Sequence, residues 1–454
     1  MKLIYNVKDR PPFSQTIVFA IQQLLAIMAA TLVVPGIVGH GMAPSAALFG
    51  AGVGTLVYQL FTKFRSPVFL GSSFAFLGSM ASAFAGAATV ALGYLGLIIG
   101  AVLAGLVYVV IAIVVKLVGV NWINKLMPAV VIGPIVSIIG LSLAGNAVGD
   151  IVTGGVKVNN VPLASPYVAL ICGLVTLATV MICATYGKKM TRLIPFILGI
   201  LAGYAVAFIF TLIGNAMDVD ALKVLSLDSF KALVDGGVSL KTFVALPDFT
   251  FVTAYGAFGE LTGSYIASVA VAYVPVAFVV FAEHLADHKN ISSIIESDLL
   301  EDPGLHRTLL GDGVGSMAGA FFGGCPNTTY GESVGCVAIT GNASVVTIFA
   351  AAIGAIFISF LSPFVAFVNS IPSCVMGGVC MALYGFIAVS GLKMIQKVDL
   401  EQNRNLFVVS TILISGIGGL TLTFGKVTIT SVACALILGI LANLLLSKAD
   451  KKGE

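Results

Sequence analysis

The chain has 454 residues, of which 58% are hydrophobic and only 9% are charged, and its formal net charge is +3 at pH 7. A soluble domain carries about 25% charged residues, so this composition excludes a soluble globular protein and indicates an integral membrane protein. The seven cysteines are scattered through apolar sequence without metal-ligand spacing, and we expect neither a metal nor a cofactor.

Apolar runs of about 20 residues recur along the chain, and a helix of that length crosses the hydrocarbon core of a bilayer. Strand patterns of alternating hydrophobicity are missing, which argues against an outer-membrane barrel. The sequence therefore predicts an all-α polytopic membrane protein with about fourteen segments. They lie near residues 13–35, 46–62, 73–88, 91–115, 128–146, 166–187, 193–214, 264–288, 307–323, 331–341, 343–367, 372–391, 404–424 and 428–447.

The distribution of positive charge gives the orientation, because Lys and Arg gather on cytoplasmic loops. With a cytoplasmic N-terminus, fourteen segments put 18 of the 23 Lys and Arg residues on the cytoplasmic side. We therefore expect a multi-pass protein of the cytoplasmic membrane with both termini in the cytoplasm. The five positive residues on the opposite side are Lys157, Lys223, Lys231, Lys241 and Lys426.

The second half of the chain resembles the first. "PAVVIG" at 128–133 recurs as "PSCVMG" at 372–377, and both open a segment. "SSFAF" at 72–76 is echoed in the same order by "TTYGE" at 328–332. Two matches in the same order indicate an internal repeat.

Each half holds about seven segments, and an odd number forces the second half to lie upside down relative to the first. Inverted repeats are the architecture of secondary transporters, which hold their substrate near the midplane of the membrane between broken helices. We predict the first repeat at 1–215, an extracytoplasmic loop at 216–262, and the second repeat at 263–454.

One of the short segments contains "CPNTTYGESVG", residues 325–335, which no ordinary spanning helix would hold. Pro326 and Gly331 disfavour a continuous helix, and the Thr–Thr–Tyr run prefers extended backbone. Non-helical backbone at membrane depth survives only inside protein or beside a cavity. We predict a short strand that leads into a half-helix, paired with a counterpart strand in "GSSFAF" at 71–76. The N–H groups at the start of both half-helices would then point into one cavity.

The second polar stretch is "FAEHLADHKN" at 281–290, at the end of the eighth segment. Glu283 and Asp287 are four residues apart and share one face of a helix. An acid inside a spanning segment costs about 2.5–3.5 kcal/mol, so such acids are usually functional or paired. The alternative is that the helix leaves the membrane here and that its acids lie in water. A second carboxylate at the broken helix, Glu332, favours the functional interpretation.

Two carboxylates that face two helix N-termini make a specific kind of site. Carboxylates accept hydrogen bonds and helix N-termini donate them, so a flat neutral ring with N–H and C=O groups satisfies both. The acids would repel an anion, and the helix N-termini would repel a bare cation. Because burial disfavours a charged carboxylate, a proton on one of these acids is the natural coupling ion.

Five motifs in this order and spacing resemble the nucleobase–ascorbate transporter family, and within it the bacterial uracil permeases. They are "GSSFAF", "FAEH", "DPGLHR" at 302–307, "PNTTYGE" and "MGGV…LYG" at 376–385. The resemblance runs from about residue 10 to about residue 447. It implies a seven-plus-seven inverted repeat with short antiparallel strands in segments 3 and 10. It also implies a core domain (segments 1–4 and 8–11), a gate domain (5–7 and 12–14) and proton-coupled import of uracil by alternating access.

The resemblance also implies roles for individual residues. Glu283 corresponds to the acid that binds the pyrimidine and takes part in proton coupling, together with Asp287. Glu332 corresponds to a second acid that binds the base and belongs to the proton-coupling set. The positions that border the base match Phe74, Tyr330, Gly331 and, through water from the gate domain, Tyr384.

Three positions depart from the uracil permease pattern. Asp287 stands where a histidine is usual, Ser333 where an asparagine follows the second acid, and Gln22–Gln23 where a Gln–His pair is usual. Purine-transporting relatives often have an acid at the position of Asp287, but they commonly have glutamine at the position of Glu332. We therefore expect uracil as the first substrate and xanthine or another purine as the alternative.

Two rival functions differ from nucleobase transport. An anion transporter on the same plan should carry a cationic or neutral residue where Glu283 and Glu332 stand. A nucleobase sensor would usually carry an appended signalling domain. We expect no enzyme and no nucleic-acid partner; the partners are the base, a proton and the lipid bilayer, and a homodimer is compatible with them. His288 and His306 are predicted to be loop or interfacial residues rather than ligands.

Overall fold

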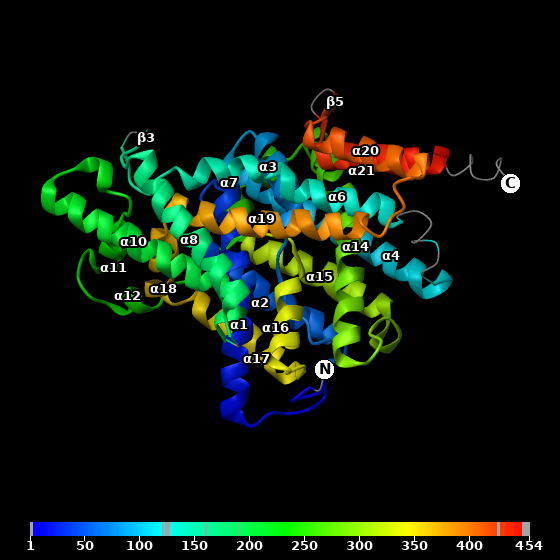
Figure 1. Cartoon of the computed structure of the whole chain (residues 1–454), viewed down its shortest axis with the longest axis horizontal. Helices are drawn as coiled ribbons and strands as arrows, with labels where there is room; N and C mark the ends of the chain where they lie inside the picture. Colours follow the sequence, from blue (N-terminus) through cyan, green and yellow to red (C-terminus); the bar gives the residue numbers. More distant parts are fainter. Residues whose placement is uncertain are drawn as a thin grey trace.

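The computed structural model of the chain describes residues 3–119, 122, 128–158, 161–188, 190–424 and 427–446. Helices dominate it (Figure 1). The longer helices are α1 (Phe13–Val38), α2 (Pro44–Phe61), α3 (Leu77–Ala85), α4 (Val90–Val118), α6 (Ala129–Ser142), α7 (Ala144–Ile151), α8 (Pro166–Tyr186), α10 (Pro195–Met217), α14 (Gly263–Ile295), α15 (Leu305–Gly323), α16 (Gly331–Thr340), α17 (Val345–Ser359), α18 (Ser362–Ser370), α19 (Ser373–Ile395), α20 (Asn403–Ile417) and α21 (Ser431–Leu446).

Shorter elements connect these helices. Short helices α11 (Asp228–Val234), α12 (Leu240–Phe243) and α13 (Thr250–Ala254) lie in the predicted loop between the repeats. The hairpin β5 (Leu422–Phe424) and β6 (Val427–Ile429) joins α20 to α21. Some of the charged residues that were used for the orientation lie outside the described residues: Lys2, Lys125, Lys189, Lys426, Lys448, Lys451 and Lys452.

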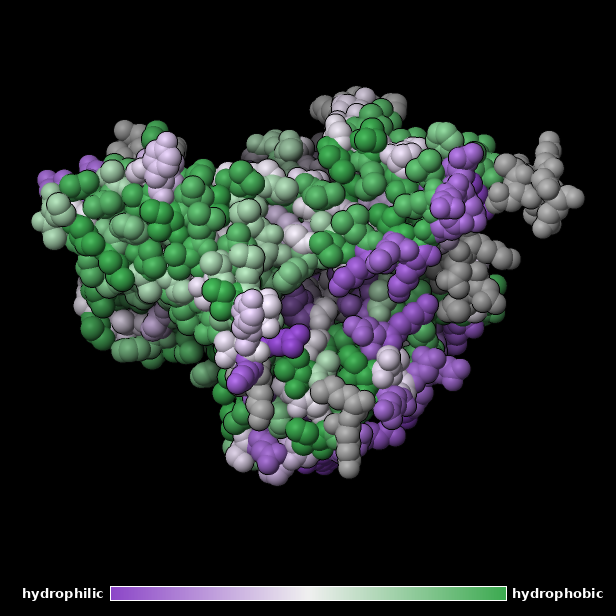
Figure 2. Space-filling view, viewed as in Figure 1, coloured by the Kyte–Doolittle hydropathy of each residue, from purple (hydrophilic) through white to green (hydrophobic). Residues whose placement is uncertain are grey.

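The outer surface of the helices is that of a membrane protein. Eight helices among the described residues are long and apolar enough to cross a bilayer, and four shorter apolar helices accompany them. Large apolar side chains such as Tyr167 and Ile182 on α8 and Ile209 on α10 are exposed. Figure 2 shows that the surface over α8 and α10 is mostly hydrophobic, which suits contact with lipid. The predicted fold class is confirmed, while the number of fourteen segments stays a prediction.

Two of the membrane segments are interrupted by a short strand, and these two strands pair with each other across the two halves of the chain. The strand β1 (Leu70–Ser72) leads through a short turn of 3-10 helix, η1 (Phe74–Phe76), into α3. The strand β4 (Asn327–Thr329) leads into α16. The two strands pair antiparallel, with Leu70 opposite Thr329 and Ser72 opposite Asn327. The backbone hydrogen bonds of these extended residues are thereby satisfied inside protein, as membrane depth requires.

Helix packing follows the two-fold relation that an inverted repeat produces. Helix α4 of the first half packs on α14 and α15, and its counterpart α17 packs on α1 and α2. In the same way α8 packs on α10 and α19, while α20 packs on α21 and α6. The pairs α2–α15 and α6–α19 join corresponding helices of the two halves. Helices α1–α4 and α14–α17 thus form one group, and α6–α10 with α19–α21 form another.

Glycines allow α2 and α15 to cross at backbone contact. A Cβ atom on Gly50 would lie 2.4 Å from the carbonyl oxygen of Gly319, and one on Gly54 would lie 2.7 Å from that of Gly315. The side chain of Asn327 in β4 enters this crossing, where its Nδ2 donates to the Gly50 carbonyl at 3.0 Å. Small residues at such crossings let helices in a membrane approach closely. The crossing therefore fixes β4 between the two helices.

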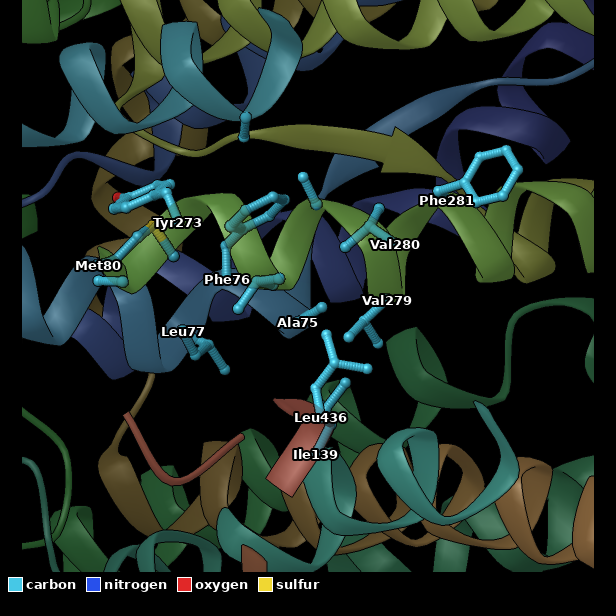
Figure 3. Close-up of a cluster of buried hydrophobic side chains, with 14 of the residues drawn as sticks. Ala75, Phe76, Leu77, Met80, Ile139, Tyr273, Val279, Val280, Phe281 and Leu436 are labelled. Atoms are coloured by element: carbon cyan, nitrogen blue, oxygen red, sulfur yellow. The ribbon is translucent and has the colours of Figure 1, made fainter. Parts of the chain in front are cut away.

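The half-helix α3 lies along α14 and is held there by aromatic and apolar side chains. Figure 3 shows Met80 of α3 and Phe76, the last residue of η1, near Tyr273 of α14, and the rings of Phe76 and Tyr273 stack at 5.5 Å between centroids. Ser79 Oγ donates to the Ala272 carbonyl of α14 at 2.7 Å. The start of α3 is thus fixed relative to the acids of α14.

Helix α14 continues beyond the predicted end at residue 288 and reaches Ile295. The stretch "FAEHLADHKN" therefore lies inside the helix, not at its end. His288 is fully buried, which corrects the prediction of a loop or interfacial residue. The residue after the helix, Glu296, has a left-handed φ of 53°, and no glycine or proline marks this end in the sequence.

Candidate functional site

A cavity of about 410 Å³ lies between the two groups of helices, where both broken segments meet α14. One wall comes from η1, α14, β4 and α16, and the other from α6, α10 and α19. Figure 2 shows hydrophilic side chains set back in a hollow between α19 and α16. The lining residues that the sequence had indicated are Phe74, Glu283, Asp287, Tyr330, Gly331 and Glu332.

The N-terminus of α16 points unused backbone donors toward this cavity. Tyr330 precedes the helix with extended backbone (φ −107°, ψ 124°), and no side chain caps the helix. The first N–H groups of a helix have no partner within it, so that of Gly331 is free to bind a ligand, whereas the Val334 N–H already donates to the Tyr330 carbonyl. A Cβ atom on Gly331 would meet only Asp287 Oδ1, at 3.9 Å, so the backbone here is open on the cavity side.

The start of η1 repeats this arrangement in the first half. Ser73 has extended backbone (φ −78°, ψ 123°) and makes no side-chain cap, and Phe74 and Ala75 line the cavity. The two starts are tied together, because the Tyr330 hydroxyl donates to the Ser72 carbonyl at 2.6 Å. Two helix N-termini with positive partial charge therefore face one cavity.

Three carboxylates line the same cavity. Glu283 and Asp287 come from one face of α14, and Glu332 is the second residue of α16. Asp287 Oδ2 also accepts a hydrogen bond from Thr329 Oγ1 of β4 at 2.8 Å. Asp287 thus connects α14 to the strand pair, whereas Glu283 is exposed to the cavity.

Tyr384 lies beside the cavity and not among the residues that line it. Its ring meets that of Phe74 edge to face, with 6.1 Å between centroids. Its hydroxyl is buried and has no hydrogen-bond partner among the described residues. Tyr384 of α19 therefore packs against the ring of Phe74.

Two of the three departures from the uracil permease pattern contact each other. Gln23 Nε2 of α1 donates a hydrogen bond to Ser333 Oγ of α16. The same Ser333 Oγ accepts from the backbone N–H of Phe69, next to β1, at 3.0 Å. Ser333 thus links α1, α16 and the approach to β1. Both positions stand out in the sequence as departures from the family pattern. Their contact could not be predicted, because the two residues are 310 positions apart in the chain.

A buried polar cluster behind the cavity escaped the sequence analysis. His284 and His288 of α14 are fully buried and contact Asp312 of α15 and Tyr58 of α2, respectively. The one feature of the sequence that indicates this cluster is the i, i+4 spacing of the two histidines, which places both on one face of a helix. Among the described residues, no group of three or more His, Cys, Asp and Glu side chains could hold a metal ion.

Apolar helices around a polar cavity at two broken segments are the architecture of a secondary transporter. The chain matches the model of a permease family (Xan_ur_permease) over residues 14–424. It is 39% identical to the uracil permease of Bacillus caldolyticus over 100% of this chain and 97% of that one. It is 36% identical to the uracil permease of Bacillus subtilis, over 99% and 97% of the two chains. The chain belongs to the nucleobase–ascorbate transporter family, in its uracil permease branch.

Solved structures with this fold have little sequence in common with the chain. The transmembrane domain of the cyanobacterial bicarbonate transporter BicA aligns with a TM-score of 0.62 at 14% identity, over 96% of this chain and 99% of that one. Murine Slc26a9, an anion transporter in the inward-facing state, aligns with a TM-score of 0.63 at 13% identity, over 98% and 69%. These likenesses support the seven-plus-seven fold alone.

Proposed function

We propose that the protein imports uracil across the cytoplasmic membrane together with a proton. The observation that carries this proposal is that Glu283, Glu332 and two uncapped helix N-termini line one cavity. The names of the relatives support a nucleobase as the substrate.

Uracil suits this cavity because its ring is flat and neutral and alternates N–H and C=O groups. Its N–H groups can donate to the carboxylates of Glu283 and Glu332, and its carbonyls can accept from the free N–H groups at Gly331 and Phe74. The ring of Phe74, supported by Tyr384, offers an apolar face to the base. A water molecule would extend the reach of the Tyr384 hydroxyl to the site.

Proton coupling is proposed for Glu283, Asp287 and Glu332. A carboxylate at membrane depth without a basic partner is stabilised by taking up a proton. Among the described residues, no Lys or Arg forms an ion pair with any of the three. A proton on Glu283 would move with the base and be released with it.

Alternating access is proposed as a movement of one group of helices past the other. The cavity lies between the group α1–α4 with α14–α17 and the group α6–α10 with α19–α21. We propose the first as the core domain and the second as the gate domain, with repeats at 1–215 and 263–454. Both termini would then lie in the cytoplasm.

The alternative substrate is xanthine, because Asp287 stands where uracil permeases usually have histidine. An anion is the weaker alternative: the fold is shared with anion transporters, but three acids in the cavity would repel an anionic substrate.

The test is uptake of labelled uracil by proteoliposomes that contain the purified protein, with and without an imposed pH gradient. We expect accumulation above the external concentration only when the outside is more acidic. Empty liposomes are the control. The proposal would be contradicted if the proteoliposomes took up labelled bicarbonate as well as they take up uracil. It would also be contradicted if they took up no uracil under any pH gradient.

A further inference from the structure

Behind the cavity, α14 presents two buried histidines on a face that does not line it. His284 and His288 are both 0% exposed. His284 Nδ1 lies 2.7 Å from Asp312 Oδ2 of α15, and its Nε2 lies 3.0 Å from Thr308 Oγ1. The Thr308 hydroxyl is also within 3.0 Å of the Leu305 carbonyl, to which it can donate. Both ring nitrogens of His284 are therefore engaged inside the protein.

The basic partner of Asp312 among the described residues is His284. It is 1% exposed, and in the described part of the chain no Lys or Arg pairs with it. Its second oxygen, Oδ1, has no hydrogen-bond partner there. An uncompensated charge at this depth is costly. The pair is neutral only when it holds a proton between the two side chains, as imidazole with carboxylic acid or as imidazolium with carboxylate.

Other ionisable groups face this pair from every helix around it. Glu283 interacts electrostatically with Asp312 as well as with Asp287 and Glu332. The Tyr108 hydroxyl is buried, has no hydrogen-bond partner in the described part of the chain, and interacts electrostatically with both Asp312 and Glu283. The groups that face the pair are Glu283, Asp287 and His288 from α14, Tyr58 from α2 and Tyr108 from α4.

His288 differs from His284 in its surroundings. Its Nδ1 lies 2.8 Å from the His284 carbonyl, and its Nε2 lies 2.7 Å from the Tyr58 hydroxyl. The Tyr58 hydroxyl is also 2.7 Å from Ser66 Oγ. His288 thus contacts neutral groups, whereas His284 contacts a carboxylate. The two histidine rings stack at 4.0 Å, so the second ring would oppose a charge on the first.

We propose that His284 and Asp312 form a second proton-binding site, separate from the cavity carboxylates, whose proton occupancy is coupled to that of Glu283. This inference rests on the proposed proton coupling of uracil transport. When the pair releases its proton to water, it is left with one negative charge, and Glu283 then holds its own proton more strongly. When Glu283 releases its proton, the pair retains the shared one. The membrane interior thereby avoids carrying two buried negative charges at once.

The test compares Asp312→Asn with His288→Asn in the purified full-length protein. Asp312→Asn keeps the shape of the side chain but removes the acid. We expect Asp312→Asn to bind uracil, because Asp312 does not line the cavity. We also expect the pH dependence of uracil affinity, measured by calorimetry, to shift by one pH unit or more, which is about tenfold in proton concentration.

His288→Asn is the matched control, since it also removes a buried ionisable side chain but leaves the His284–Asp312 pair intact. Because it removes the ring that stacks on His284, we expect a shift of the pH profile that is well below that of Asp312→Asn. A wild-type profile in Asp312→Asn, or an equal shift in His288→Asn, would overturn the proposal. Wild-type protein that fails to bind uracil at any pH would instead contradict the proposed function.

A second measurement does not depend on the folding of a variant. Infrared spectra of wild-type protein with carbon-13-labelled aspartate, recorded during a pH titration, report protonated aspartate directly through its carbonyl band. We expect a band from a buried carboxylic acid whose intensity changes when uracil is added. If the intensity of the aspartate carbonyl bands changes neither with pH nor with uracil, the pair does not exchange its proton, and the proposal fails.

Discussion

Glu332 is the single acid in the first turn of α16, and it lines the cavity. Glu332→Gln keeps the shape of the side chain but replaces an acceptor with a group that partly donates. We expect uracil binding to weaken by about 1.5–3 kcal/mol, the value of a hydrogen bond to a charged group. Calorimetry measures the change. The matched control is Glu301→Gln in the exposed segment before α15, which should bind as the wild type does; equal affinity in both variants would remove Glu332 from the site.

Glu283 and Asp287 share a face of α14 but have different surroundings. Glu283 is open to the cavity, whereas Asp287 is held by Thr329. We expect Glu283→Gln to abolish accumulation of uracil against its gradient, because the proton carrier is lost. Asp287→Asn should retain accumulation and shift its pH dependence. The measurement is uptake into proteoliposomes under an imposed pH gradient, and concentrative uptake by Glu283→Gln would assign the proton to another group.

The sequence showed which acids are unusual but not what contacts them. Glu283 and Glu332 could be recognised because an acid in apolar sequence is costly and therefore noticeable. The contact between Gln23 and Ser333 depends on how distant segments meet, and no local pattern encodes it. His288 was misassigned because its burial depends on the length of α14, and that helix passes the predicted end without a helix-breaking residue.

At the scale of elements, the crossing of α2 and α15 controls the position of β4. A Cβ atom on Gly54 would lie 2.3 Å from Asn327 Nδ2 and 2.7 Å from the Gly315 carbonyl. We expect Gly54→Ala to lower stability by about 1–3 kcal/mol through overpacking, and to weaken uracil binding because β4 leads into α16. Thermal unfolding of the detergent-purified protein measures the first effect, and calorimetry the second.

Gly335→Ala is the matched control for this element. Gly335 is also in a helix, but a Cβ atom there would have no neighbour within 4 Å. Alanine should therefore stabilise α16 by about 0.5–1 kcal/mol, since it loses less conformational entropy than glycine on folding. If Gly54→Ala unfolds at the temperature of the wild type, the crossing does not hold β4 as tightly as the contacts suggest.

The broken segments were the most predictable elements, because proline, glycine and β-favouring residues interrupt apolar sequence there. That the two strands pair was predicted, but their register was not, since it depends on how two strands more than 250 residues apart are placed. The role of the crossing glycines around Asn327 required the structure, because Asn327 reaches them from another segment.

The fold of the whole molecule does not indicate the class of substrate, whereas the side chains of the site do. The chain shares its fold with anion transporters at 14% identity or less. Two helix N-termini in a cavity would suit an anion equally well. The acids from α14 and α16 change this preference, because they accept hydrogen bonds and repel negative charge. We therefore propose that a few side chains on a shared architecture decide the substrate class.

Selection among nucleobases depends on which ring positions carry N–H groups. A site with two carboxylates needs two ring N–H donors, which uracil supplies at N1 and N3. Cytosine lacks the N3–H and presents an amine where uracil has a carbonyl, so it would turn a donor toward the N–H groups of α16. Each buried polar group left unpaired costs about 1–3 kcal/mol, enough to reject cytosine by about tenfold or more.

Thymine keeps both N–H groups and differs by one methyl group, so its exclusion would be steric and weaker. Xanthine offers N–H and C=O edges but must place a second ring beside Phe74 and the residues of α6 and α19 that close the cavity. We expect competition against labelled uracil in the order uracil, then thymine, then xanthine, with cytosine and adenine poor. Adenine serves as the control for non-specific purine binding, since it lacks the carbonyls. If xanthine competes better than uracil while adenine does not, Asp287 has shifted the site toward purines, and xanthine is the substrate.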